Sequence, residues 1–201
     1  MPLGRAALLL SIVLAGIVGC SPRVGDRLLS LPESTPDADE CDVIATTLDG
    51  VAALLDQFPV PAERKRWLTS LKPSRIIRNS QPLDLGLTSH TIVLARADVQ
   101  IGFASHSVII AAGAVRIAHS ENNVVVSGRD VAISHDGSQG TGSLVVSKGS
   151  TRISHARNTL IYAGDGVEVS FATDVRAFNT EDREASWGRI DNTVVAPLFQ
   201  K

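Results

Sequence analysis

Three histidines recur at one point of a repeating pattern, and imidazole nitrogens are common ligands of transition metals. They are His119, His135 and His155, in the stretches VRIAHS, VAISHD and TRISHA. The same point of other repeats holds Leu87, Phe103 or Phe171. A metal site needs ligands that converge and outer groups that orient them, whereas a position shared with Leu and Phe favours a stacked, half-buried corner. We therefore expect no metal ion and no cofactor.

Carboxylates are the next candidates for chemistry, because glycoside hydrolysis uses two acids roughly 5–10 Å apart. Asp98 and Asp130 occupy the same point of two repeats that are not adjacent, and Asp136 stands alone. The Ser-His dipeptides are not catalytic dyads, because neighbouring side chains of a strand point to opposite faces. The chain also lacks the GxSxG, P-loop and HExxH motifs. The sequence thus predicts that the protein is not an enzyme.

The elements that position these residues form a repeat of about 16 residues. One apolar position recurs with steps of 16, 16, 16, 20 and 16 residues, at Ile76, Ile92, Val108, Val124, Leu144 and Leu160. A second apolar pair keeps the same phase, as in Val99/Ile101 and Val115/Ile117. An insertion, DGSQGT (136–141), explains the step of 20 residues. The pattern weakens after residue 170, but NTVVAP (192–197) echoes NTLIYA (158–163).

A repeat this short suits one strand, a turn, a second strand and a corner, but not a pair of helices. The sequence predicts an all-β fold, a single-stranded parallel β-solenoid (β-helix) of about 16-residue coils stacked about 4.8 Å apart, with a short N-terminal α-helical cap. Glycines of the turn, such as Gly113 and Gly164, are expected to need positive φ. Polysaccharide lyases and hydrolases with parallel β-helices, and the polymer-forming bactofilins, resemble this chain only in coil architecture.

Residues 1–20 are typical of a targeting segment, with Arg5 before the apolar run AALLLSIVLAGIVG. The residues IVGC (17–20) resemble the bacterial lipobox, which implies lipidation of Cys20 and attachment to a membrane through an acyl anchor. Ser21 follows, where inner-membrane retention signals usually carry Asp. The resemblance therefore implies the outer membrane, on its periplasmic or surface side, in a cell with two membranes. An uncleaved anchor is the alternative.

The rest of the chain divides into three parts. Residues 21–40 are rich in Pro, Ser, Asp and Glu and predict a disordered tether. Residues 41–73 are expected to form the helical cap, with an amphipathic helix over 41–58 that ends at Pro59 and a short helix over 61–72. The solenoid domain spans residues 74–198. Cys41 is the one cysteine besides Cys20, which favours a buried thiol over a disulfide to another chain.

The first strand of each coil carries three consecutive apolar residues. We interpret the flanking ones, such as Ile92 and Leu94, as inward-facing. The middle ones then form an outward apolar stripe, made of Val93, Ile109, Val125, Val145 and Ile161. Soluble monomers rarely leave such a stripe bare. Either the helix over 41–58 covers it, or it is an interface with a second copy or with another envelope protein.

The second strand carries an outward polar column, formed by Gln100, Arg116, Arg152 and Glu168. A net charge of −2 gives no basic patch for nucleic acid. Only 4% of residues are aromatic, which argues against stacking of sugar rings. We therefore predict a non-catalytic, lipid-anchored scaffold or protein-interaction module of the cell envelope. A module that binds envelope polysaccharide through the polar column and the DGSQGT loop is the alternative, and a carbohydrate-active β-helix enzyme is less favoured.

Overall fold

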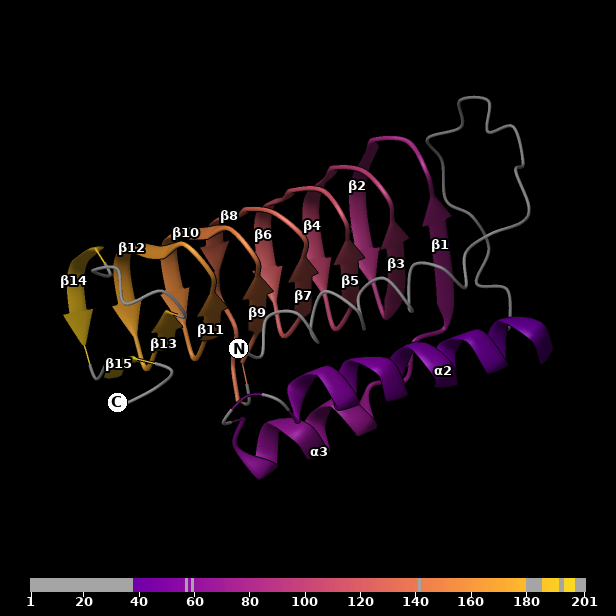
Figure 1. Ribbon diagram of the computed structural model, residues 1–201, viewed down its shortest axis with the longest axis horizontal. Coiled ribbons are helices and arrows are strands. Elements are labelled where there is room, and N and C mark those ends of the chain that lie inside the picture. The colour runs from indigo at the N-terminus through magenta and orange to yellow at the C-terminus, as the bar shows by residue number, and fades with distance from the viewer. Residues whose placement is uncertain are drawn as a thin grey trace.

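The computed structural model describes residues 38–56, 58, 60–140, 142–179, 186–191 and 194–197 (Figure 1). Two helices, α2 (Ala38–Leu55) and α3 (Ala62–Ser70), precede the strands. The targeting segment, Cys20, most of the tether and Pro59 lie outside the described residues. No described helix has the length and apolar character needed to cross a bilayer.

The strands form two parallel sheets that face each other across the solenoid. The first, called here the straight sheet, contains β1 (Arg75–Asn79), β3 (Thr91–Ala95), β5 (Val108–Ala111), β7 (Val124–Ser127), β9 (Leu144–Ser147), β11 (Leu160–Ala163), β13 (Arg176–Asn179) and β15 (Val194–Pro197). The second, called the bent sheet, contains β2 (Leu83–Ser89), β4 (Val99–Ser105), β6 (Val115–Glu121), β8 (Val131–Asp136), β10 (Ser150–Arg157), β12 (Gly166–Thr173) and β14 (Ser186–Asp191). The chain alternates between them, as a parallel β-solenoid requires.

The strand register confirms the predicted coil length. Ile92 pairs with Val108 and Val108 with Val124, each a step of 16 residues. Across the insertion Val124 pairs with Leu144, so the longer coil keeps its register. β13 and β15 continue the straight sheet, and β14 continues the bent one. The weak pattern after residue 170 therefore still encodes coils.

The direction predicted for the apolar stripe is wrong. Its five residues point into the solenoid, pack against the inner face of the bent sheet and are 0% exposed, at Val93, Ile109, Val125, Val145 and Ile161. They are core residues and offer no surface to a partner. The error has a physical cause: all three positions of each short strand are apolar, so alternation cannot tell the inner face from the outer one.

The flanking residues of these strands point outward and are covered by the two helices. Ile92, Leu94, Val108 and other members of this face form one cluster with apolar residues of α2 and α3. In Figure 1 both helices lie along the straight sheet, below its strands in this view. Helical cover of an outer apolar face was thus one of the two predicted alternatives, but the face consists of different residues. When both faces of a sheet are buried, the sequence of each strand is a continuous run of apolar residues.

The strands of the second sheet each bend at one residue. In β4, Gln100 is exposed and Ile101 is buried, but the next two residues, Gly102 and Phe103, are both exposed. Register pairing also skips Gly102, on the rung where Phe103 pairs with His119. The bend therefore divides the outer surface of this sheet into two facets.

Positive φ occurs at the corner that precedes the straight strands. Non-glycine residues take φ from 47° to 53° there, at His90, His106, Asn122, Asn158 and Asp174. Gly142 occupies the corresponding corner after the insertion, with φ 73°. The prediction that Gly113 and Gly164 need positive φ is wrong. A Cβ on Gly164 would lie 1.9 Å from the Lys148 carbonyl oxygen, so close stacking of coils explains that glycine.

Replacing Gly142 with alanine is expected to destabilise the solenoid strongly. Its φ is positive, and an added Cβ would lie 1.6 Å from the Asn158 carbonyl oxygen. Gly140 is the matched control, because its φ is 68° but nothing lies within 4 Å of an added Cβ. In urea unfolding, Gly140→Ala should cost about 1 kcal/mol and Gly142→Ala at least about 3 kcal/mol. Equal costs would contradict the close contact with Asn158.

Two smaller features also differ from prediction. α2 begins at Ala38, so the last residues assigned to the tether are helical. Cys41 lies on this helix and is exposed, not buried. Its neighbours Asp42 and Glu40 are polar, and the buried stripe of the helix begins further along, at Thr47 and Val51.

Candidate functional site

One column of the bent sheet holds every large hydrophobic side chain that is exposed in the described part of the chain. These are Leu87 (69% exposed), Phe103 (36%) and Phe171 (48%). Between the two phenylalanines, on successive rungs, lie His119, His135 and His155, all exposed. We call the six residues the ladder. The sequence predicted this column as a half-buried corner, and the burial was wrong: all six residues are exposed, because they follow the bend of each strand on its outer side.

The rings of the ladder contact one another along the solenoid from His119 to Phe171. The His155 and Phe171 centroids are 4.7 Å apart with planes at 14°, so these rings stack. His135 is 5.6 Å from His155 and 6.0 Å from His119, with planes tilted by 43° and 49°. Within the described residues no three His, Cys, Asp or Glu side chains are grouped so that they could hold a metal ion. The ladder is therefore a row of exposed side chains, four of whose rings contact their neighbours.

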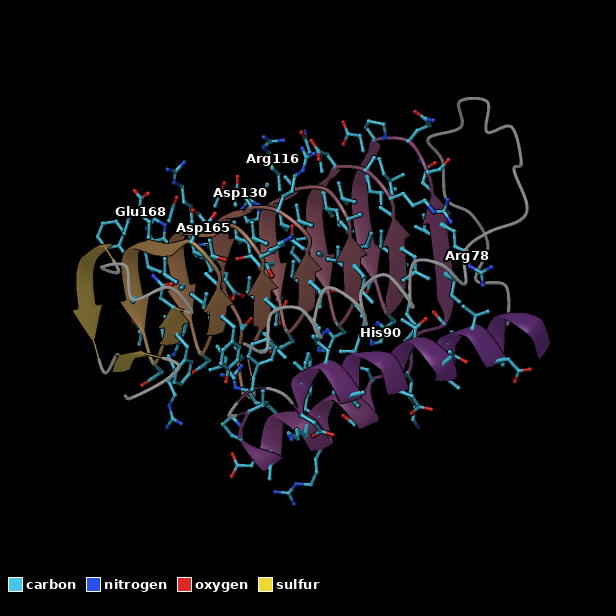
Figure 2. The ribbon with its side chains drawn as sticks, viewed as in Figure 1. Arg78, His90, Arg116, Asp130, Asp165 and Glu168 are labelled. Atoms are coloured by element: carbon cyan, nitrogen blue, oxygen red, sulfur yellow. The ribbon has the colours of Figure 1, made fainter. Side chains whose placement is uncertain are left out.

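The predicted polar column lies on the other side of the bend. Gln100, Arg116, Arg152 and Glu168 are all exposed, as expected. Arg152 donates to Glu168 at 2.9 Å, a pair that contributes little to stability because both side chains meet water. Figure 2 shows Arg116 and Glu168 along the edge of the solenoid remote from α2 and α3. This column and the ladder belong to different facets.

The facet of the ladder includes a second outward column, two residues further along each strand. Its members are Ser89, Ser105, Glu121, Arg157 and Thr173, of which Ser105 is buried, and Gly137 just past the end of β8, whose amide donates to the Ser120 carbonyl oxygen at 3.0 Å. Glu121 is half-buried and Arg157 is exposed. No ion pair involves either of them among the described residues. We call the ladder and this column together the ladder facet.

The interior behind this facet contains a polar column that was not predicted from the sequence. Its residues are fully or nearly fully buried, at Thr91, Ser107, Asn123, Ser143 and Thr159. They link successive coils. The backbone amide of Ser107 donates to Asn123 Oδ1 at 2.9 Å, and the backbone amide of Asn123 donates to Ser143 Oγ at 3.2 Å. The signal was visible, since a small polar residue directly follows every left-handed corner from His90 to Asn158, although Val175 follows the last one, Asp174. The column satisfies backbone donors that burial would otherwise leave without acceptors.

Asp136 lies at the end of this polar interior and is 1% exposed. Thr159 Oγ1 donates to its Oδ2 at 2.7 Å, Ser143 Oγ donates to its Oδ1 at 3.0 Å, and the Ser138 hydroxyl also donates to Oδ1. Burial raises the pKa of Asp136, and the three hydroxyl hydrogen bonds oppose that shift. The carboxyl is thus a structural centre of the insertion, closed to any substrate.

Arg64 joins α3 to the same corner of the solenoid. Its guanidinium donates to the carbonyl oxygens of Ser143 (2.6 Å) and Asn158 (2.7 Å). Burial lowers the pKa of Arg64 to about 10, while the nearby Asp136 opposes the shift, so the side chain is cationic at neutral pH. The helical cap is therefore held by a directional contact as well as by apolar packing.

The other two acids considered as catalytic candidates, Asp98 and Asp130, link adjacent coils. Asp98 Oδ1 accepts a hydrogen bond from the Ala114 amide at 2.9 Å, and Asp130 Oδ1 accepts one from the Ser150 amide at 2.8 Å. Each carboxylate satisfies a backbone donor one coil further on. Hydrogen bonds from an Asp carboxylate to backbone amides are typical of turns, so both residues have a structural role at the corner.

Comparisons of the chain with protein-family models, with curated proteins and with solved structures gave no match.

Proposed function

We propose that the chain is a non-catalytic interaction scaffold, held at the bacterial cell envelope by a lipid on Cys20. The observation that carries this proposal is the concentration of exposed large hydrophobics in one column, at Leu87, Phe103 and Phe171. Exposed apolar side chains gathered in one place are typical of interaction surfaces. A stacked solenoid holds them at fixed spacing, as a recognition surface requires.

The ring geometry supports a protein partner over the polysaccharide alternative. A sugar ring packs on the face of an aromatic ring, but His155 and Phe171 each cover one face of the other at a centroid distance of 4.7 Å. The polar column that would bind a glycan contains no aromatic residue. The ladder thus offers exposed apolar side chains suited to contact with side chains of another protein.

A photo-reactive phenylalanine analogue placed along the bent sheet tests this proposal. At Phe103 or Phe171 it should give protein cross-links in intact envelopes, because both positions lie in the ladder. Position Gln100 is the control, since it is exposed but lies on the other facet. Equal cross-linking at all three positions would contradict the proposal, and cross-links to glycan from position 100 alone would favour the alternative. Cys20→Ser should release the chain from the membrane fraction if the anchor is a lipid.

A further inference from the structure

We propose that the ladder facet binds a second copy of this chain and forms a dimer with two-fold symmetry. This inference rests on the proposed function, because it names the partner of the same surface. Its basis is the order of side chains along the two columns of the facet.

From Phe103 to Phe171, the order of residue types along the ladder is the same in both directions. Its order is Phe103, His119, His135, His155 and Phe171, centred on His135. A dimer with two-fold symmetry requires that if one residue faces another, the second also faces the first. Two facets packed with antiparallel solenoid axes meet this condition. Phe103 then faces Phe171 of the second copy, and the imidazoles, which can both donate and accept, face imidazoles.

The second column provides independent evidence through its charges. The same two-fold axis, placed at the rung of His135, puts Glu121 opposite Arg157 of the second copy, and Arg157 opposite its Glu121. Neither side chain has an ion-pair partner in the described parts of its own chain. Gly137, the first residue after β8, continues the pairing through its amide, which donates to the Ser120 carbonyl oxygen at 3.0 Å, so it lies at the axis and brings no side chain to it. Opposite charges thus meet twice in each dimer.

Other arrangements bring unlike or repelling groups together. If the two-fold axis were parallel to the solenoid axes and ran between the two columns, each column would face the other one. Phe103 would then face Ser105 of the second copy, and His155 would face its Arg157. If the interface extended over the bend with the axes antiparallel, Arg116 would face Arg152. The bend turns that polar column away, so the antiparallel contact is confined to the ladder facet.

The small size of the facet predicts weak association in dilute solution. The symmetric part, the five rungs from Phe103 to Phe171 at about 4.8 Å, is roughly 20 Å long, and its two columns lie only about 7 Å apart. A strip of this size buries much less than the standard interface of about 800 Å² per partner. Attachment to one membrane would raise the effective concentration of the copies and compensate for a small contact. Dimerisation is therefore expected mainly on the membrane or at high protein concentration.

The test is sedimentation equilibrium of the full chain in density-matched detergent micelles, over a range of protein-to-detergent ratios. The wild type should show a monomer–dimer equilibrium. Glu121→Arg or Arg157→Glu should weaken it about tenfold, since each creates two like-charged pairs. The double reversal should restore the wild-type constant within about threefold, because opposite charges meet again. Arg116→Glu, an exposed charge on the other facet, is the matched control and should have no effect.

Circular dichroism of each variant checks that it is folded, as expected for substitutions of surface charges. A wild type that stays monomeric at every ratio overturns the inference, and so does a double reversal that fails to restore the dimer. If the inference fails but Phe103 still cross-links to another protein, the proposed function stands with a different partner. If both tests fail, the proposed function falls as well.

Discussion

The Val125→Asp variant is expected to fail to form a stable solenoid. Val125 is 0% exposed and pairs with Ile109 and Val145 on the adjacent rungs, in the middle of the core. A carboxylate there has no partner and no water, which costs more than about 5 kcal/mol. This is comparable to the whole stability of a typical domain, about 5–15 kcal/mol. Circular dichroism should show loss of strand structure without denaturant.

Ala132→Asp is the matched control for this prediction. Ala132 is exposed and lies between Arg116 and Arg152 on the adjacent rungs. The same carboxylate is therefore expected to change the free energy of unfolding by no more than about 0.5 kcal/mol. If Val125→Asp instead folded normally and changed only self-association, the middle residues would face outward after all.

Removing the carboxyl of Asp136 should produce the second largest effect. In Asp136→Ala, the hydroxyls of Ser138, Ser143 and Thr159 lose their common acceptor inside the protein. Ser138 and Ser143 can still bond each other and Thr159 can still donate to the Arg157 carbonyl oxygen, but three hydrogen bonds are lost at about 1 kcal/mol each, so the loss of unfolding free energy should be about 3 kcal/mol. Urea unfolding measures this loss. Gln139→Ala is the control, because Gln139 is an exposed residue of the same insertion and its substitution should change little.

The pH dependence of the Asp136→Asn variant provides a separate check. Burial raises the pKa of Asp136 above its ordinary value of 3.8. The unfolded chain then loses its proton at lower pH than the folded one, so this group's contribution to stability is full below pH 3.8 and is lost as the pH rises through the folded value. Asparagine does not titrate. The stability of the wild type relative to the variant should therefore fall with rising pH, and a constant difference would contradict the raised pKa.

The coil length could be predicted from the sequence because it is a matter of spacing. Positions such as Ile92, Val108 and Val124 recur whatever their direction, and the structure pairs them as predicted. The insertion was also visible, since it shifts one step without disturbing the next. The exposure of the polar residues Gln100 and Arg116 followed from their alternation with buried neighbours.

Which face of the straight sheet points into the solenoid could not be predicted from spacing. Ile92, Val93 and Leu94 are all apolar because one face meets the core and the other meets the helices. Only the packing of α2 and α3 distinguishes the two faces. Contacts between distant segments, such as Arg64 with Ser143, have no local signal in the sequence. The same holds for the burial of Asp136, whose acidic side chain next to glycine reads as an exposed turn.

The coil that joins Val124 to Leu144 has 20 residues instead of 16, yet both of its neighbours pair in register. The added residues leave the solenoid at one corner, where Gln139 and Gly140 are exposed. Such a corner is a suitable site for inserting a foreign peptide. A peptide spliced between Gln139 and Gly140 would be displayed outside the core, and the domain could acquire new sequence there over evolution while its stack of coils remained unchanged.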